Sequence, residues 1–319
     1  MHPILLRLSL SGRVLEVHSF GVMVALGCVL GTLLAMREAR ARGVDPAVIR
    51  DLCLWGLALS LLGARLLDVV TAGRQGWDDC LDAAAAAGAG AALSACTRPL
   101  LPWEGGLAFY GGVVTGVGTA ALFAHRHGLP LAATLDLLTP SLPLGHALGR
   151  VGCLLAGCCF GQPTTLPWGI AFTDGSIAYR ELQTVDGLGA DAPATPPLHP
   201  TQVYEAAGEL LLFALLMRRR RHTRFPGELA LLWLCGYAAL RFTVELVRGD
   251  TARGFWVALH TPTLDRLLGL PPSTTTLLST SQGIAAVLFF CALALLLLGR
   301  RRTLLASPAA TTALPAATR

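Results

Sequence analysis

The sequence predicts an all-α, polytopic membrane protein with seven transmembrane helices. Hydrophobic residues make up 53% of the 319 residues and charged residues only 14%, whereas soluble domains carry about a quarter charged residues. Apolar blocks of about 20 residues, the length that crosses the hydrocarbon core, recur along the chain. The alternation typical of membrane β-strands is absent from the sequence, so we expect helices that satisfy their own backbone amides.

Seven blocks are the predicted spans, and in chain order they are 19–36, 48–70, 105–124, 131–152, 201–217, 227–247 and 280–298. The first is expected to be an uncleaved span, because Arg37 and Glu38 follow it instead of a small-residue cleavage site. A single membrane-embedded domain is expected over 1–306, with long loops at 71–104, 153–200 and 248–279 and a disordered cytoplasmic tail at 307–319.

Arginine placement predicts the orientation. All 25 residues of the Lys+Arg count are arginine, which excludes lysine-nucleophile chemistry. They are concentrated after the first, third, fifth and seventh spans, including Arg218 to Arg221 and Arg300 to Arg302. By the positive-inside rule, the carboxyl terminus is cytoplasmic, and the amino terminus and long loops face outward.

Charged residues inside the spans are functional hypotheses by default, because burying them in lipid is costly. Arg65 and Asp68 are three residues apart in the second span, and we interpret them as a neutralised structural pair. Arg150 lies at the outer end of the fourth span, four residues after His146 and so on the same helix face.

Arg241, Glu245 and Arg248 follow at helical spacing in the sixth span and predict one charged stripe with net positive charge. Guanidinium groups offer a planar fork of donors that suits phosphate or carboxylate. At membrane depth the abundant anion is a phospholipid headgroup, so the stripe predicts a lipid-phosphate site.

Polar residues at the start of the fifth span form a further cluster. Thr201 or His199 could cap this helix, but capping does not require Gln202, Tyr204 and Glu205 as well. We therefore expect the cluster to contribute to substrate binding.

Glycine pairs flank the start of the third span. Gly112 and Gly116 have the four-residue spacing of close helix packing. Packing does not explain Gly105 and Gly106, which predict irregular backbone or amides open to an anion. Gly111 belongs to the same predicted substrate-binding segment.

The nine cysteines fall into three groups. Four lie in spans, where cysteine packs as a small hydrophobe. Cys80 and Cys96 lie in one outward loop, where a disulfide is a candidate. Cys153, Cys158 and Cys159 follow Arg150, and their spacing is not CxxC. We therefore expect these cysteines to shape a loop. A metal site shared with His146 and His199, and a redox role, are the less favoured alternatives.

Eight ordered motifs resemble the bacterial prolipoprotein diacylglyceryl transferase family, and they are HSFG (18–21), GARL (63–66), WEGGLAFYGG (103–112), GRVGC (149–153), GQPTTLPWGIAF (161–172), HPTQVYEA (199–206), RFTVELVRGD (241–250) and LSTSQG (278–283). The chain is thus similar to a branch that carries GlyCysCys after the fourth span.

The resemblance implies an inner-membrane enzyme with its site toward the periplasm. It would transfer the diacylglyceryl group of phosphatidylglycerol to the lipobox cysteine of a preprolipoprotein and release glycerol phosphate. Arg150 and Arg241 correspond to essential arginines of the family, and Glu245 and Arg248 to other residues of that site.

Two departures from the family bear on the site. Tyr110 stands where some members have a histidine proposed as the base, so Tyr110 and His146 are both candidates for accepting the thiol proton. Phe20 stands where many members have a tyrosine that contacts the headgroup.

Cofactor motifs such as a P-loop or GxGxxG are absent from the sequence, so no cofactor, metal or nucleic acid is expected, and a monomer is expected. Two alternatives stay open: a related transferase with another acceptor, and a non-catalytic lipid-binding or anion-transport protein.

Overall fold

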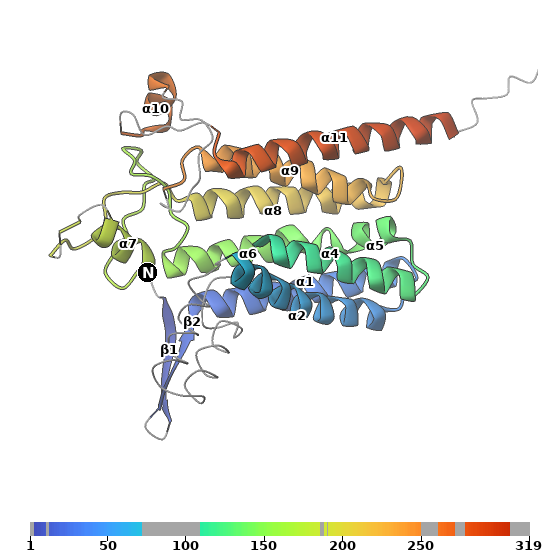
Figure 1. Ribbon diagram of the computed structural model, residues 1–319, viewed down its shortest axis with the longest axis horizontal. Coiled ribbons are helices and arrows are strands. Elements are labelled where there is room, and N and C mark those ends of the chain that lie inside the picture. The colour runs from blue at the N-terminus through green and yellow to red at the C-terminus, as the bar shows by residue number, and fades with distance from the viewer. Residues whose placement is uncertain are drawn as a thin grey trace, which may run out of the picture. The chain divides into compact units, whose positions relative to one another are not determined.

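The computed structural model describes residues 3–10, 13–71, 109–185, 188–189, 191–249, 261–271 and 278–306 (Figure 1). These residues are mostly helical. The elements are β1 (Ile4–Leu10), β2 (Arg13–His18), α1 (Ser19–Ala41), α2 (Pro46–Thr71), α4 (Phe109–Arg126), α5 (Leu131–Leu138), α6 (Ser141–Ala156), α7 (Ile177–Val185), α8 (Thr201–Arg219), the 3-10 helix η2 (Arg220–His222), α9 (Glu228–Glu245), α10 (Pro262–Leu268) and α11 (Thr280–Ala306).

Helices occupy the described parts of all seven predicted blocks, with one change in the fourth. The block 131–152 is two helices, α5 and α6, because the chain turns at residues 139–140. Pro140 stands at the N-cap of α6, and Pro143 lies in its first turn. Proline cannot donate the backbone hydrogen bond that would continue α5 through this point. The prediction of one continuous helix over this block is therefore wrong.

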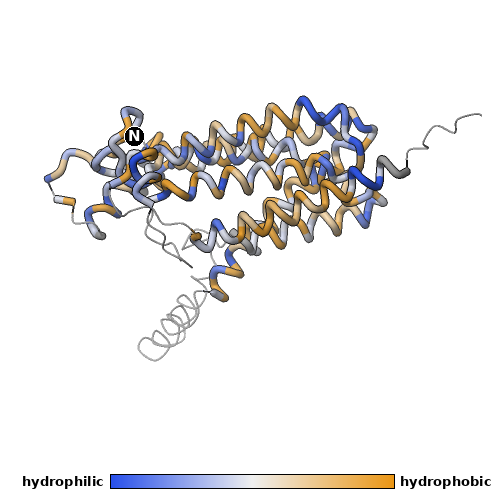
Figure 2. Tube along the Cα trace, turned by 90° about the horizontal axis from the view of Figure 1, so that it is seen from above, coloured by the Kyte–Doolittle hydropathy of each residue, from blue (hydrophilic) through white to orange (hydrophobic). Residues whose placement is uncertain are grey.

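Within the described residues, three helical segments are long and apolar enough to cross a membrane, namely Ser19–Ala41, Pro46–Thr71 and Thr280–Thr303. Their outer faces carry large apolar side chains, such as Trp55 at 57% and Phe290 at 66% exposure. The other described helices are shorter or carry charged residues. Figure 2 shows hydrophobic residues along most of the helical length and hydrophilic residues toward helix ends, as expected for helices in lipid.

The chain forms two compact units. In the unit of Ala35–Leu137, α2 packs against α4. A Cβ at Gly63 would lie 2.8 Å from the carbonyl oxygen of Gly111, so the two helix backbones approach closely. Arg65 Nη1 lies 2.9 Å from Asp68 Oδ2 in α2, which confirms the predicted neutralised pair.

The other unit, Met1–Leu34 with Leu138–Arg319, holds the β-hairpin and the series α6, α8, α9 and α11, in which each helix packs against the next (Figure 1). The first half of α1 packs on α6, where a Cβ at Gly27 would lie 3.0 Å from Gly145 O. The described part of the segment 157–200 contains α7, and a buried hydrophobic cluster in it includes Phe160, Phe172 and Leu198.

Strands β1 and β2 pair antiparallel, with Arg7 opposite Glu16. The predicted elements did not include these strands. The alternating pattern of LRLSL at 6–10 is the period of a half-exposed strand. The hairpin ends at His18, and α1 begins directly after it at Ser19.

Candidate functional site

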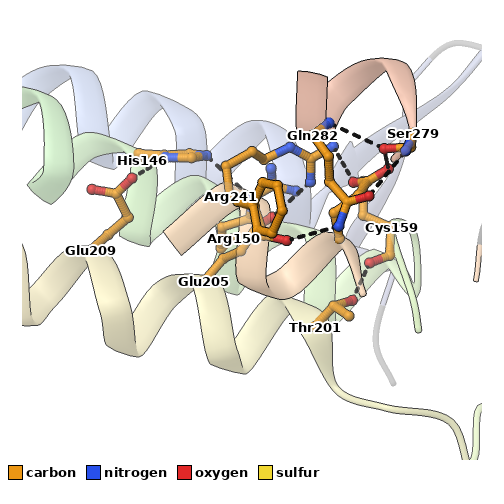
Figure 3. A network of polar contacts seen from close by, with 11 residues as sticks. His146, Arg150, Cys159, Thr201, Glu205, Glu209, Arg241, Ser279 and Gln282 are labelled. Carbon is orange, nitrogen blue, oxygen red and sulfur yellow. Dashed lines mark hydrogen bonds and ion pairs between the residues drawn. The ribbon is translucent and has the colours of Figure 1, made fainter. Parts of the chain in front are cut away.

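The candidate site is a network of charged side chains from α6, α8 and α9 (Figure 3). Arg150 on α6 and Arg241 on α9 both contact the carboxylate of Glu205 on α8. Arg241 Nη1 lies 3.1 Å from Glu205 Oε1, and Arg150 Nε pairs with Glu205 Oε2. Because Glu205 is only 3% exposed, two guanidinium groups and not water compensate its charge.

A second carboxylate and the start of α11 hold Arg241 in place. Arg241 Nη2 lies 2.9 Å from Glu245 Oε2, one helical turn further along α9. Ser279 Oγ donates to Glu245 Oε1 at 3.0 Å. Gln282 Oε1 accepts from the backbone amides of Leu278 and Ser279 at 2.8 and 3.0 Å, which shapes the segment that carries Ser279. The guanidinium of Arg241 is therefore oriented from two sides.

His146 connects Arg150 to a third carboxylate. Its Nδ1 lies 2.7 Å from Glu209 Oε1, and its Nε2 accepts from Arg150 Nε at 3.2 Å. The pattern assigns the Nδ1–H tautomer, with the proton toward Glu209. Trp233 Nε1 donates to the other oxygen of Glu209 at 3.5 Å. Glu209 is fully buried, so the position of His146 is well determined.

Glu209 was not among the predicted site residues. The signal was present in the sequence, because Glu205 and Glu209 are four residues apart in an apolar helix and so share one face. Two carboxylates on one face of a predicted span indicate that cations on neighbouring helices meet that face.

The predicted positive stripe on one helix is wrong in two respects. Helix α9 ends at Glu245, and Arg248 lies in the following segment, where it pairs as a β-bridge with Gly161. The amide of Gln162 donates to Val247 O at 2.8 Å, which draws the chain away from helical geometry. The arginines are also balanced by buried carboxylates, so an anion would share the guanidinium groups with Glu205 and not meet bare positive charge.

The polar residues at the start of α8 hold the loop that follows α6. Thr201 Oγ1 donates to Cys159 O at 2.6 Å, and Gln202 Nε2 donates to Cys158 O at 2.7 Å. The N-cap of α8 is Pro200, with no side-chain cap hydrogen bond. The capping interpretation of Thr201 is therefore wrong.

His199 and Tyr204 join the start of α8 to two other loop segments. His199 Nε2 lies 2.9 Å from Leu268 O in α10, and its Nδ1 lies 3.1 Å from Tyr204 Oη. Trp168 Nε1 donates to Tyr204 Oη at 2.7 Å. Burial lowers the pKa of His199, so its neutral form is favoured. His199 therefore does not cap α8, and a role in substrate binding stays a prediction for both residues.

The three cysteines after Arg150 converge. Their Sγ atoms all lie within 4.8 Å of one another. Helix α6 ends with Gly157 at φ 74°, and Cys159 has φ 57°, a left-handed conformation that is rare outside glycine. Thiol hydrogen bonds from Cys153 and Cys158, together with Arg248 and Arg150, lower the pKa of Cys159. His146 and His199 bind other groups and do not join this cluster.

Three other predicted site residues contact neighbouring helices. A Cβ at Gly111 would overlap the backbone of Gly63, and a Cβ at Gly112 would lie 3.2 Å from Ser60 O, so both glycines permit the packing of α4 on α2. Phe20 on α1 lies against α6, where a Cβ at Gly152 would be 3.2 Å from the Phe20 ring. Their roles toward a substrate stay predictions.

Some predicted positions lie outside the described residues, namely Gly105, Gly106, Cys80, Cys96, the side chain of Tyr110, most of 71–104 and the tail 307–319. The candidate disulfide therefore also stays a prediction.

Comparison with known proteins identifies similar sequences. The family model of prolipoprotein diacylglyceryl transferase matches residues 6–298. The phosphatidylglycerol–prolipoprotein diacylglyceryl transferase of Mycolicibacterium paratuberculosis is 36% identical over 239 residues, which are 74% of this chain and 53% of that protein. The protein of the same name from Clostridium tetani is 28% identical over 236 residues, 74% of this chain and 82% of the relative. The chain thus spans about half the length of the mycobacterial relative.

Proposed function

Because the chain belongs to the prolipoprotein diacylglyceryl transferase family, we propose that it transfers the diacylglyceryl group of phosphatidylglycerol to a preprolipoprotein cysteine and releases glycerol phosphate. The observation that carries this proposal is the convergence of Arg150 and Arg241, from two helices, on the buried carboxylate of Glu205. Two oriented guanidinium groups are a suitable site for a phosphate diester.

The arginines stabilise the leaving group. In the reaction the thiolate sulfur forms a bond to the glyceryl carbon, and the bond from that carbon to the phosphate oxygen breaks with its electron pair. The phosphate thereby changes from a singly charged diester toward a monoester with more charge. Each guanidinium has five N–H donors, so Arg150 and Arg241 can donate to phosphate oxygens while keeping contacts to Glu205. Donors already aimed at developing charge lower the barrier most.

His146 acts as a positioning residue for Arg150 in this proposal. Its Nε2 accepts from Arg150 Nε, and its Nδ1 proton points to Glu209. The lone pair that could take up the thiol proton is thus occupied by Arg150. We expect His146→Ala to lower activity by releasing Arg150, and Tyr110→Phe to lower activity if the phenol accepts the proton. Full activity in both variants would leave thiol activation to another group.

The proposed topology has seven spans, the amino terminus and the site on the periplasmic side of the inner membrane, and the carboxyl terminus in the cytoplasm. The positions of the helices and the arginines at 218–221 and 300–302 support it. Fusions of alkaline phosphatase and of green fluorescent protein after residue 306 test it. We expect only the fluorescent fusion to be active, and an active phosphatase would reverse the orientation.

An in vitro assay tests the transferase proposal. Purified protein receives phosphatidylglycerol labelled in both glycerol moieties and a lipobox peptide. Wild type is compared with Arg150→Ala, Arg241→Ala and the control Arg50→Ala, whose exposed side chain pairs with Asp51. We expect lipidated peptide and glycerol phosphate from wild type and the control, and loss of both products in the two site variants.

Two results would count against the proposal. Bound phosphatidylglycerol without product from folded wild type would favour another acceptor or a lipid-binding protein. Full activity of Arg150→Ala and Arg241→Ala would remove the arginine pair from the mechanism. The expected monomeric state is tested on the same preparation by light scattering in detergent.

A further inference from the structure

The thiols of Cys153, Cys158 and Cys159 form a cluster whose geometry suits a metal ion. All three Sγ atoms lie within 4.8 Å of one another. On a tetrahedral zinc ion with Zn–S bonds of about 2.3 Å, two sulfur atoms are roughly 3.8 Å apart. The distance between any two of the three sulfur atoms would therefore have to shorten by about 1 Å at most for them to bind one ion.

The backbone around the cluster is held in an unusual conformation. Cys159 has φ 57°, where a residue with a Cβ is strained and glycine is preferred. Two side chains of α8 hold this segment: the carbonyl group of Cys158 accepts a hydrogen bond from Gln202, and that of Cys159 accepts one from Thr201. This arrangement folds two adjacent cysteines back toward Cys153 at the end of α6.

The surroundings suit a metal–thiolate group with net negative charge. Three thiolates and a divalent ion carry one negative charge together. Arg150 and Arg248 both interact electrostatically with Cys159, so their positive charges compensate it. Arg150 is three residues before Cys153 on α6 and also contacts Glu205. The thiol cluster therefore adjoins the arginine network of the proposed phosphate site.

We propose that Cys153, Cys158 and Cys159 bind a zinc ion whose fourth tetrahedral position receives the acceptor thiol. The site itself rests on the cysteine geometry, and its role in thiol activation rests on the proposed transferase function. Three protein ligands with one open position are typical of catalytic zinc. The spacing of the cysteines is not CxxC and predicts no metal site. The left-handed conformation of Cys159, which brings the thiols together, is not visible in that spacing.

A zinc ion would explain how the acceptor thiol loses its proton. A free cysteine has a pKa of about 8.5 and is mostly protonated at neutral pH, whereas a thiol bound to zinc is deprotonated. The acceptor would lose its proton on binding, and its sulfur would then attack the glyceryl carbon. The breaking C–O bond leaves its electron pair on the phosphate, which takes up one proton, so the overall reaction needs no oxidant or reductant.

Metal binding is measured first, without lipid or peptide. The full chain is purified in detergent, reduced with a phosphine, equilibrated with zinc or cobalt and desalted. The variants are Cys153→Ser, Cys158→Ser, Cys159→Ser and the triple variant, with Cys235→Ser on α9 as the matched control. We expect roughly one zinc per chain in wild type and control, affinity lower by about tenfold or more in each single variant, and none in the triple variant.

Cobalt spectra then report the fourth ligand. A lipobox peptide with its cysteine is expected to change the absorption of the cobalt protein, and the same peptide with serine is not. Absence of zinc from reduced wild type, or equal zinc in the triple variant, would overturn the site. An unchanged cobalt spectrum, or transfer activity that survives removal of zinc by a chelator, would overturn the role in thiol activation.

The metal-binding measurement is independent of the transferase proposal. If zinc does not bind but transfer occurs, the metal site is rejected and the transferase proposal stands. If zinc binds but transfer does not occur, the transferase proposal and the role of zinc in thiol activation are rejected, and the metal site stands. Thermal unfolding shows whether a variant is folded. Without zinc, Cys159→Ser and wild type should unfold at similar temperatures. With zinc, wild type should unfold at a higher temperature than the variant.

Discussion

Replacement of Glu205 by glutamine tests whether this carboxylate is the central ion of the site. The side chain is 4% exposed, and Arg241 Nη1 lies 3.1 Å from it. At an effective dielectric constant of about 20, two unit charges at this distance attract by about 5 kcal/mol. Removing one partner of a buried ion pair costs about 3–5 kcal/mol, because the remaining charge loses its compensation. Arg241 keeps Glu245 and Arg150 keeps His146, so we expect a loss near the lower limit, about 3 kcal/mol.

The assay is unfolding by SDS in mixed micelles, followed by circular dichroism. The control is Glu16→Gln, because Glu16 forms an ion pair of similar length, 3.0 Å to Arg7 Nε, with a side chain 34% exposed. Exposed pairs contribute about 0–1 kcal/mol. Glutamine preserves the volume of Glu205, so no cavity contributes to the difference. A loss below about 1 kcal/mol, no larger than that of the control, would refute the inference that Glu205 is shielded from water and compensated by the arginines.

Three further predictions follow from burial and packing. Burial lowers the pKa of His199 below its usual 6.5. As the pH falls, His199 is therefore protonated in the unfolded chain before it is protonated in the folded protein. The contribution of the neutral His199 to stability is retained above about pH 6.5 and is lost as the pH falls below that value. Unfolding between pH 5 and 8 should show a flatter profile for His199→Gln, and identical profiles would contradict this. Gly63→Ala places a Cβ against Thr115 and should lower stability by about 1–3 kcal/mol. In the control Gly56→Ala the new Cβ meets no atom within 4 Å, and stability should rise by about 0.5–1 kcal/mol. Equal melting temperatures of the two variants would exclude close packing at Gly63. Glu228 is fully buried, and its Oε1 lies 2.7 Å from Arg219 Nη2. Glu228→Gln should lower the free energy of unfolding by about 3 kcal/mol. An unchanged midpoint of unfolding by SDS would show that water reaches the ion pair.

Much of the helical layout could be predicted from the sequence, because apolar blocks long enough to cross a bilayer are a local property. The bounds of α2 and α8 differ from the predicted blocks by only a few residues. The errors arise where local chemistry competes with hydrophobicity. Pro140 interrupts an apolar block, and the chain leaves α9 after Glu245 because the residues beyond it pair with the 160–162 segment.

The site could be predicted in part. Two of its contacts join residues four apart on one helix, Arg150 with His146 and Arg241 with Glu245, and helical spacing alone predicts such neighbours. Glu205 was placed in a substrate-binding cluster, but its bridging of both arginines connects three helices. No periodicity in a single segment contains that information.

The sequence by itself determined which long apolar blocks contain helices, which residues are charged within those blocks, and to which family the chain is similar, because these follow from local composition, spacing and motif order. The short helices α7 and α10 lie in segments that were predicted as loops. The tertiary structure alone decided how charges on different helices are paired and which thiols meet. A buried charge takes its partner from whichever helix packs beside it, so Glu205 joins Arg150 to Arg241. Cys159 reaches Cys153 only because the chain is held in a left-handed turn by contacts from α8.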